Sequence, residues 1–225
     1  MTIFSSPASS APDAAVILCG GRSLRMGFDK AAADLNGESL LHRTCRLVSQ
    51  HARRTIVVAA PDQVLPHDLT PAITVLRDKL PHQGPLYGFV TGLQFLTGEA
   101  NFPDDACCWL SACDVPFAEA SVILHLTDLC RNAPHTGRQR FDAVVMMDST
   151  ARAHPLGAVY QVGVRSMAES LIASGERSMN ALLSRLNVLR IPAETLSTET
   201  PHDRLLWNLN TPTDLQTARR YLSEN

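Results

Sequence analysis

The sequence lacks the features that mark several large classes of protein. Its 225 residues carry a net charge of −2, so the basic surplus of a general nucleic-acid-binding protein is missing. No apolar run approaches the ~20 residues that a helix needs to cross a bilayer. Residues 1–13 have neither the basic start nor the long apolar stretch of a secretory signal, and their Ser, Ala and Pro content predicts a disordered leader. We therefore expect a cytoplasmic protein with no nucleic-acid or membrane partner.

The cysteines show no Cys-x-x-Cys spacing and no Cys/His ligand pattern. There are six of them: Cys19, Cys45, Cys107, Cys108, Cys113 and Cys130. Without a ligand pattern or a secretory signal, we expect structural thiols in a reducing compartment.

What the chain does contain is a regular alternation of short apolar runs and amphipathic segments. The runs predict strands at 14–19, 55–60, 72–76, 106–113, 141–147, 156–162 and 187–191. The amphipathic segments predict helices at 39–52, 86–97, 117–131, 164–173, 178–186 and 211–223. Strand–helix alternation implies parallel pairing through right-handed crossovers, hence a three-layer α/β/α fold with a mostly parallel sheet. We expect a single domain over residues 14–225, with surface loops at 131–140 and 194–203.

The stretch "LCGGRSLRMGFDK", residues 18–30, lies where the first strand should end. It is not a Walker A loop, because five residues separate Gly21 from Gly27 and Phe28 follows. It is not a G-x-G-x-x-G dinucleotide fingerprint either, because Gly20 and Gly21 are adjacent. A P-loop NTPase and a standard Rossmann dehydrogenase are thus unsupported.

The chemistry of this corner still suits a phosphate group. Gly20 and Gly21 can bring backbone N–H groups close to a polyphosphate. Arg22, Arg25 and Lys30 add charge-assisted donors. A glycine turn with solvated basic residues is the alternative, but three cations around a strand-end glycine pair favour an anion site.

At this point the sequence resembles a known family, the molybdenum-cofactor nucleotidyltransferases within the larger group of NTP transferases. The stretch matches the pattern L-x-G-G-x-S/A-x-R-M-G-x-D-K, with Cys19 where Ala is commoner. The resemblance continues in matching order through "GPLYGFVTGL", "CDVP", "HPLGAVY", "GERSMNALL" and "NLNTPTDL". It therefore spans nearly the whole chain from residue 14 onward.

The resemblance implies a Rossmann-like nucleotidyltransferase fold and a particular reaction. GMP would pass from GTP to molybdopterin or Mo-molybdopterin, releasing pyrophosphate and forming a guanine dinucleotide cofactor. Mg²⁺ is the implied cofactor. A product that is unstable when free suggests delivery to partner proteins, although no interaction motif identifies them. We expect a monomer.

Two aspartates follow predicted strands. Asp114, in "SACDVPF", is a hard oxygen donor suited to Mg²⁺, and helix N-capping is the alternative reading. Asp78, in "VLRDKL", could equally be an exposed loop residue. The resemblance implies that Asp114 binds the metal on the nucleotide phosphates and that Asp78 lies in the nucleotide site.

The resemblance assigns the remaining roles by position. The implied catalytic residues are Arg25, Lys30 and Asp114. The implied nucleotide-binding residues are Leu18, Cys19, Gly20, Gly21, Arg22, Lys30, Asp78, Gly84, Pro85, Leu86 and Asp114. The implied acceptor-binding residues are His154, Arg177, Asn208 and Asn210. A helix-entry turn at Gly84–Pro85, capping near Thr211–Pro212, and ordinary surface roles for His154 and Arg177 remain open.

One difference from the family pattern concerns which nucleotide base is bound. In the guanylyltransferases we expect an asparagine just after the second strand, whereas this chain has Ala59 in "VVAAPDQ". A missing side-chain amide removes hydrogen bonds that help to distinguish bases. Cytidylyl transfer to the same acceptor, or transfer to another acceptor such as a sugar phosphate or phospholactate, therefore remains an alternative. A non-catalytic nucleotide-binding protein is disfavoured because Lys30 and Asp114 are both intact.

Overall fold

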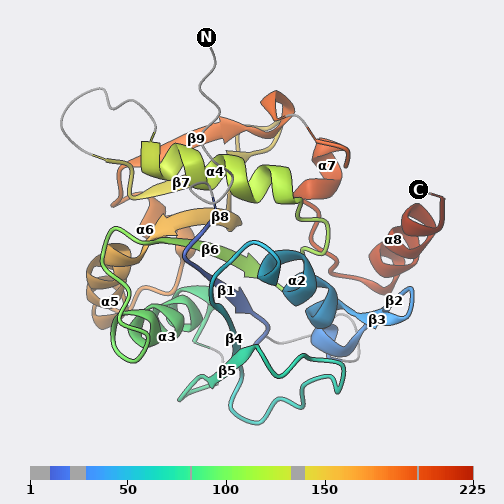
Figure 1. Ribbon diagram of the computed structural model, residues 1–225, viewed down its shortest axis with the longest axis horizontal. Helices are drawn as coiled ribbons and strands as arrows, with labels where there is room; N and C mark the ends of the chain where they lie inside the picture. The colour runs from blue at the N-terminus through green and yellow to red at the C-terminus, as the bar shows by residue number, and fades with distance from the viewer. Residues whose placement is uncertain (1–10, 21–28, 82, 133–139, 197, 225) are drawn as a thin grey trace.

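The computed structural model describes residues 11–20, 29–81, 83–132, 140–196 and 198–224, which form one seven-stranded sheet and the helices around it (Figure 1). The strand order is β5-β4-β1-β6-β8-β7-β9. The strands are β1 (Ala14–Leu18), β4 (Thr55–Ala59), β5 (Thr74–Arg77), β6 (Cys107–Ala112), β7 (Ala143–Met147), β8 (Ala153–Gln161) and β9 (Val188–Pro192). The predicted mostly parallel sheet is confirmed, because β1, β4, β5 and β6 pair in parallel and β7 pairs in parallel with β9.

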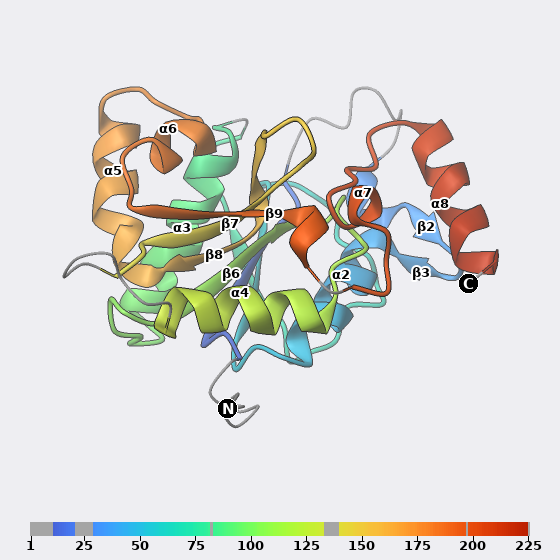
Figure 2. The same cartoon turned by 90° about the horizontal axis from the view of Figure 1, so that it is seen from above.

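Helices cover both faces of the sheet, which confirms the predicted three layers. They are α2 (Leu40–Ser49), α3 (Pro85–Thr97), α4 (Ala120–Asn132), α5 (Arg165–Ala173), α6 (Met179–Leu183), α7 (His202–Leu205) and α8 (Pro212–Glu224). Most buried apolar residues of α2 and those of α4 belong to one hydrophobic cluster, those of α3, α5 and α6 belong to a second, and α8 packs in a third with Leu40 of α2. Figure 2 shows α4 on one side of the strands and α5 and α6 on the opposite side.

Strand β8 differs from the sequence expectation. The alternation predicted parallel pairing, but β8 runs antiparallel to both β6 and β7. Only residues 148–152 separate β7 from β8, and five residues are too few for the crossover that a parallel strand requires. Strand β8 therefore begins, rather than ends, at the edge where the parallel strands end.

A short hairpin and a short helix were not predicted. Strands β2 (Asp34–Leu35) and β3 (Glu38–Ser39) pair antiparallel through Asn36 and Gly37, which have φ angles of 55° and 90°. Two positive φ angles in a two-residue turn are typical of a type I′ hairpin. The hairpin packs beside α8, where Arg219 donates to the carbonyl of Asp34. Helix α7 lies at the end of the segment that was expected to be a loop.

The six cysteines are all free and buried, as expected for structural thiols. Burial raises the pKa of Cys19 and of Cys45 to about 12, so both stay protonated at neutral pH. Asp13, assigned to the leader, hydrogen-bonds through its backbone N–H to the carbonyl of Cys107 at 2.8 Å. Asp13 is thus attached to the start of β6.

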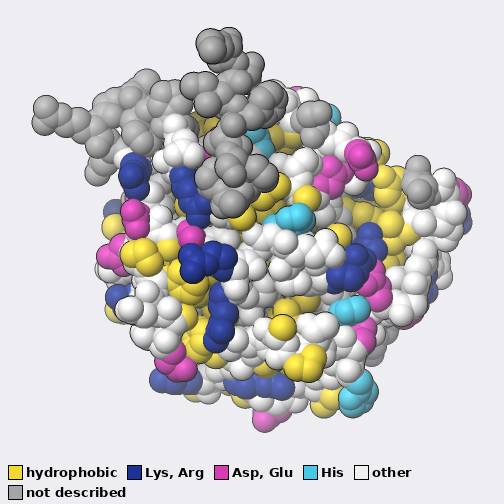
Figure 3. Space-filling view, in the orientation of Figure 1, with side chains coloured by type: hydrophobic (Ala, Val, Ile, Leu, Met, Phe, Trp, Pro, Cys, Tyr) yellow, Lys and Arg dark blue, Asp and Glu magenta, His cyan; other side chains and the backbone are white. Residues whose placement is uncertain are grey.

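The surface seen in Figure 3 mixes acidic and basic side chains among apolar ones. In the part of the chain that the structure describes, no helix has the length and apolar character needed to span a membrane.

The order of the strands places a crevice at one edge of the sheet. From β1 the chain proceeds through β4 to β5 on one side, and β6 then pairs with β1 on the other side. Loops after β1 and β6 therefore diverge in opposite directions. In open α/β sheets, ligands bind outside the carboxyl ends of the strands at such a point.

Candidate active site at the carboxyl ends of β1 and β6

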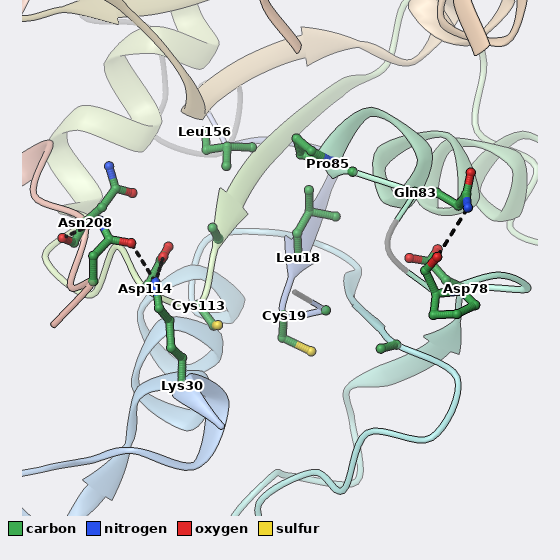
Figure 4. Close-up of a pocket in the computed structure, with 16 residues that line it drawn as sticks. Leu18, Cys19, Lys30, Asp78, Gln83, Pro85, Cys113, Asp114, Leu156 and Asn208 are labelled. Carbon is green, nitrogen blue, oxygen red and sulfur yellow. Dashed lines mark hydrogen bonds and ion pairs between the residues drawn. The ribbon is translucent and has the colours of Figure 1, made fainter. Parts of the chain in front are cut away.

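A cavity of about 620 Å³ occupies this crevice (Figure 4). Most of its lining comes from residues that follow strands, together with the start of α3 and the segment before α8. The lining residues are Leu18, Cys19, Gly20, Lys30, Ala60, Asp78, Pro81, Gln83, Gly84, Pro85, Ala112, Cys113, Asp114, Leu156, Asn208 and Asn210. Its volume lies in the range of sites for small molecules and cofactors.

Three predicted residues from distant parts of the chain meet at one end of the cavity. The ammonium of Lys30 lies 3.0 Å from Oδ2 of Asp114 and donates to Oδ1 of Asn210 at 2.7 Å. The Lys30 and Asp114 side chains are 18% and 19% exposed, so both retain a path to the cavity while solvent screening is reduced. This arrangement combines a cation, a carboxylate and an amide oxygen within hydrogen-bond reach.

The start of α8 fixes the position of Asn210. Thr211 caps the helix by accepting from the Asp214 N–H at 3.1 Å, while the Asp214 carboxylate accepts from the N–H groups of Asn210 and Thr211. Burial opposes ionisation of Asp214, but these hydrogen bonds and the charge of Lys30 hold its pKa below the usual value. The backbone N–H of Leu209 donates to the carbonyl of Asp114 at 2.9 Å, which joins this segment to the end of β6.

Asp78 lies at the other end of the cavity, away from Lys30 and Asp114 (Figure 4). Its carboxylate accepts from the Thr91 hydroxyl at 2.9 Å, and its backbone N–H donates to the carbonyl of Ala59. Partial burial raises the pKa of Asp78, although the Thr91 hydrogen bond opposes the shift. Asp78 is therefore a positioned carboxylate and not a free loop residue.

Two lining glycines occupy places that a larger residue would disturb. A Cβ on Gly20 would lie 2.9 Å from the backbone nitrogen of Ala60, so the ends of β1 and β4 approach closely here. Gly84 has φ +84°, and a Cβ there would lie 3.1 Å from the carbonyl oxygen of Arg177. Glycine is thus required by backbone geometry at both positions.

Some predicted site residues lie elsewhere. Leu86 is fully buried in the core under α3, so its side chain does not line the cavity. His154 and Arg177 are also absent from the lining: His154 pairs with Asp148 at 2.9 Å, and Arg177 donates to the carbonyls of Ile172 and Glu176. Their acceptor-binding role stays a prediction. Gly21, Arg22 and Arg25 lie outside the described residues.

Other lining residues were missed in the sequence. Leu156 reaches the site because β8 is antiparallel, which brings the first half of this strand to the carboxyl edge of the sheet. At the end of β4 the cavity is lined by Ala60, whereas Ala59 is fully buried in the core. The signal for Ala60 was available, because it follows a strongly apolar strand. For Gln83 we see no such signal.

The donor set suits a metal held mainly by its substrate. Among the described residues, no group of three or more His, Cys, Asp or Glu side chains could hold a metal ion. Asp114 offers one carboxylate, and Asn208 and Asn210 line the same cavity. Mg²⁺ commonly takes one or two carboxylates and completes its octahedron with phosphate oxygens and water. The residues present therefore fit Mg²⁺.

Comparison with known proteins agrees with this architecture. The family model of the MobA-like NTP transferase domain matches residues 15–190. The chain belongs to this family. It is 36% identical over 182 residues to the "Probable molybdenum cofactor guanylyltransferase" of Mycobacterium tuberculosis H37Rv, covering 80% of this chain and 83% of the relative. The protein of the same name from Mycobacterium marinum is 35% identical over 204 residues, covering 90% of each chain.

Two solved structures share the fold. Molybdopterin-guanine dinucleotide biosynthesis protein A from Archaeoglobus fulgidus superposes with a TM-score of 0.73 at 22% identity, covering 94% of this chain and 100% of that one. 2-C-methyl-D-erythritol 4-phosphate cytidylyltransferase from Thermus thermophilus gives a TM-score of 0.64 at 16% identity, with 94% and 99% coverage. Both likenesses confirm the Rossmann-like nucleotidyltransferase fold.

Proposed function

We propose that this member of the family is a guanylyltransferase that moves GMP from GTP to the phosphate of molybdopterin, with or without bound molybdenum. The observation that carries the proposal is the Lys30–Asp114–Asn210 cluster at one end of a nucleotide-sized cavity. The names of the mycobacterial relatives support the choice of GTP and of the acceptor. The product would then pass to the proteins that use it.

The reaction needs no covalent enzyme intermediate. A phosphate oxygen of the acceptor attacks the α-phosphorus of the triphosphate, and the bond from that phosphorus to the bridging oxygen of pyrophosphate breaks. The protein contributes alignment and neutralisation of charge. Lys30 supplies a positive charge for the phosphoryl oxygens, and its bonds to Asp114 and Asn210 hold the ammonium in place before substrate binds.

We propose Asp114 as the protein ligand for Mg²⁺. When bound, Mg²⁺ would neutralise phosphate charge and orient the triphosphate. Asp114 would hold this charge beside Lys30, and Asn210 would keep the Lys30 ammonium oriented through the amide oxygen. Gly20 lines the cavity at the end of β1, where its backbone would approach the phosphate groups.

The far end of the cavity suits the base. With the phosphates at Lys30, the base would extend toward Asp78. The two oxygens of Asp78 can accept from donors such as the N1–H and 2-amino groups of guanine, although one already accepts from Thr91. Cytosine is the second candidate, because neither Ala59, where the family pattern has an asparagine and which is buried here, nor the lining residue Ala60 offers a side-chain amide to distinguish the base.

A nucleotide panel tests the proposal. Pyrophosphate release is measured with GTP, CTP, ATP and UTP in turn, in the presence of Mg²⁺ and molybdenum cofactor freshly released from a donor protein. We expect turnover with GTP that requires the cofactor and disappears when a chelator removes Mg²⁺. CTP preference would move the activity to cytidylyl transfer. No turnover with any of the four nucleotides would contradict this acceptor and direct the search to a different phosphorylated one.

A further inference from the structure

Gln63 lies in the loop after β4, and its side-chain amide joins three segments beside the proposed phosphate end. Its Nε2 donates to the carbonyl of Cys19 at 3.1 Å and to the two carboxylate oxygens of Asp29 at 3.0 and 2.8 Å. Its Oε1 accepts from the backbone N–H of Ala60 at 3.2 Å. A primary amide can donate and accept at once, so Gln63 connects the ends of β1 and β4 to Asp29.

Asp29 in turn fixes the short 3-10 helix η1 (Lys30–Ala32), which carries Lys30. The carboxylate of Asp29 accepts from the Ala31 N–H at 2.9 Å and caps this helix. Lys30 is the first helical residue, and its ammonium contacts Asp114 and Asn210. The position of the Asp29 carboxylate therefore constrains the backbone at Lys30, from which the side chain with the ammonium extends.

Gln63 is itself anchored from the neighbouring strand. The guanidinium of Arg77, at the end of β5, donates to the carbonyls of Gln63 and Ala60 at 2.6 and 3.0 Å. A chain of hydrogen bonds thus runs from β5 through the loop after β4 to Asp29 and Lys30. Such supporting contacts matter because a displacement of about 1 Å from productive geometry can lower a rate about 100-fold.

We propose that Gln63 is a positioning residue for Lys30 and acts through Asp29. The proposal deepens the nucleotidyl-transfer function proposed above and rests on it. Gln63 touches no reacting group. Its amide sets the place of the ammonium that neutralises charge in the transition state.

A double-mutant cycle between Gln63 and Lys30 tests this role. We expect Gln63→Ala to lower kcat about tenfold and to change KM for the triphosphate much less. Lys30→Ala should lower kcat about 100-fold. If Gln63 acts through Lys30, the kcat of the double variant will equal that of Lys30→Ala within about twofold, because the ammonium that Gln63 positions is already absent. Independent, multiplying losses would overturn the proposal, because they indicate a general structural role.

The contact with Asp29 is tested by exchanging the two groups. Gln63→Glu places a carboxylate against the Asp29 carboxylate and should lower kcat at least tenfold. Adding Asp29→Asn restores an amide–carboxylate pair, and asparagine still caps a helix. We expect the kcat of the double variant to be at least about threefold higher than that of Gln63→Glu alone. No such increase would contradict the route through Asp29.

Gln94→Glu is the matched control. Gln94 donates to the Glu169 carboxylate at 2.9 Å on the outer side of α3, so this change also opposes two carboxylates but away from the cavity. Its kcat should stay near the wild-type value. A loss like that of Gln63→Glu would contradict the proposal.

A crystal structure of Gln63→Ala separates this proposal from the proposed function. We expect the Lys30 ammonium to leave its positions on Asp114 and Asn210 in that variant. Unchanged contacts would overturn the proposal, whichever nucleotide or acceptor the enzyme uses. Wild-type protein that turns over no triphosphate would contradict the proposed function instead, and the crystal structure would still decide the role of Gln63.

Discussion

At the scale of single residues, Asp114 allows the proposed metal role to be tested without loss of the local hydrogen bonds. Asp114→Asn keeps an oxygen that can accept from Lys30 but removes the negative charge. We expect a kcat about 100-fold lower and a higher Mg²⁺ concentration for half-maximal turnover, because Asp114 supplies the carboxylate that the described residues place in the cavity lining near Lys30. Kinetics over a series of Mg²⁺ concentrations measure both effects.

The matched control for this change is Asp105→Asn. Asp105 also pairs with a cation, Arg140 at 3.3 Å, but it precedes β6 and is 64% exposed. Its Mg²⁺ dependence should equal that of the wild type. If Asp114→Asn also leaves the Mg²⁺ dependence unchanged, Asp114 is not a metal ligand.

Lys30 and Asp114 could be singled out in the sequence because they lie near the ends of predicted strands, which parallel topology gathers, whereas Asn208 and Asn210 were predicted from the family resemblance. Gln63 belongs to no motif and follows β4 by four residues. Its role depends on the loop folding back onto Asp29, which periodicity and spacing do not encode. Residues that position others are therefore harder to predict than residues that face the ligand.

At the scale of secondary-structure elements, α3 packs closely against β1, and one end of each element lines the cavity. A Cβ on Gly92 would lie 2.7 Å from a methyl carbon of Val16, so helix and strand approach at the limit of contact. An exposed helical Gly→Ala change stabilises by about 1 kcal/mol. Here the clash outweighs that gain, and we expect Gly92→Ala to lower the free energy of unfolding by about 1–3 kcal/mol in urea denaturation.

Shortening the opposing side chain checks the cause. Val16→Ala alone should also destabilise, because it leaves a cavity in the core. The double variant should be more stable than the sum of the two single changes predicts, because the new methyl then occupies the space that Val16 vacated. Strict additivity would show that Gly92 and Val16 do not compete for this space.

Elements were predicted well where burial makes a continuous apolar run, as in β1, β4 and β6. The directions of the strands were predicted less well, as β8 shows. The short spacing between β7 and β8, with no helical segment, could have indicated an antiparallel pair. Asn36-Gly37 is a hairpin signal that hydrophobic periodicity does not detect. Strands β2 and β3 contain only two residues each, too few for a periodic pattern.

At the scale of the whole molecule, the cavity depends on segments that are distant in sequence. Strands β1, β4 and β5 and the loops after them supply the side with Gly20, Ala60 and Asp78, while β6 and β8 supply the side with Asp114 and Leu156. The segment before α8 closes the Lys30 end with Asn208 and Asn210. Global stability and the geometry of the site are therefore coupled, since no single element holds the site.

The molecule should lose stability in acid through carboxylates that lie far apart in the sequence. Burial opposes ionisation of Glu38, but hydrogen bonds from Arg46 and Arg43 hold its pKa below the usual value, and hydrogen bonds likewise outweigh burial and lower the pKa of Glu119 and Asp214. A folded-state pKa below the unfolded value stabilises the protein above the unfolded pKa, and the contribution disappears as pH falls through the folded pKa. We expect the urea midpoint to fall as pH decreases below about 4.5.

Glu38→Gln tests the contribution of one pair of ion pairs to this acid response. The Glu38 carboxylate lies 2.8 Å from Arg43 and 2.9 Å from Arg46, at the β3 end of the hairpin. We expect the free energy of unfolding of the variant to be about 1–2 kcal/mol lower at pH 7. This free energy should also decline less steeply in acid, because the titrating group is gone. Glu99→Gln, at an exposed position after α3, should change neither the free energy of unfolding at pH 7 nor its decline in acid. An acid decline as steep in Glu38→Gln as in the wild type would locate the sensitivity in the other carboxylates, with the Asp214 cap at the Lys30 end of the cavity the next to replace.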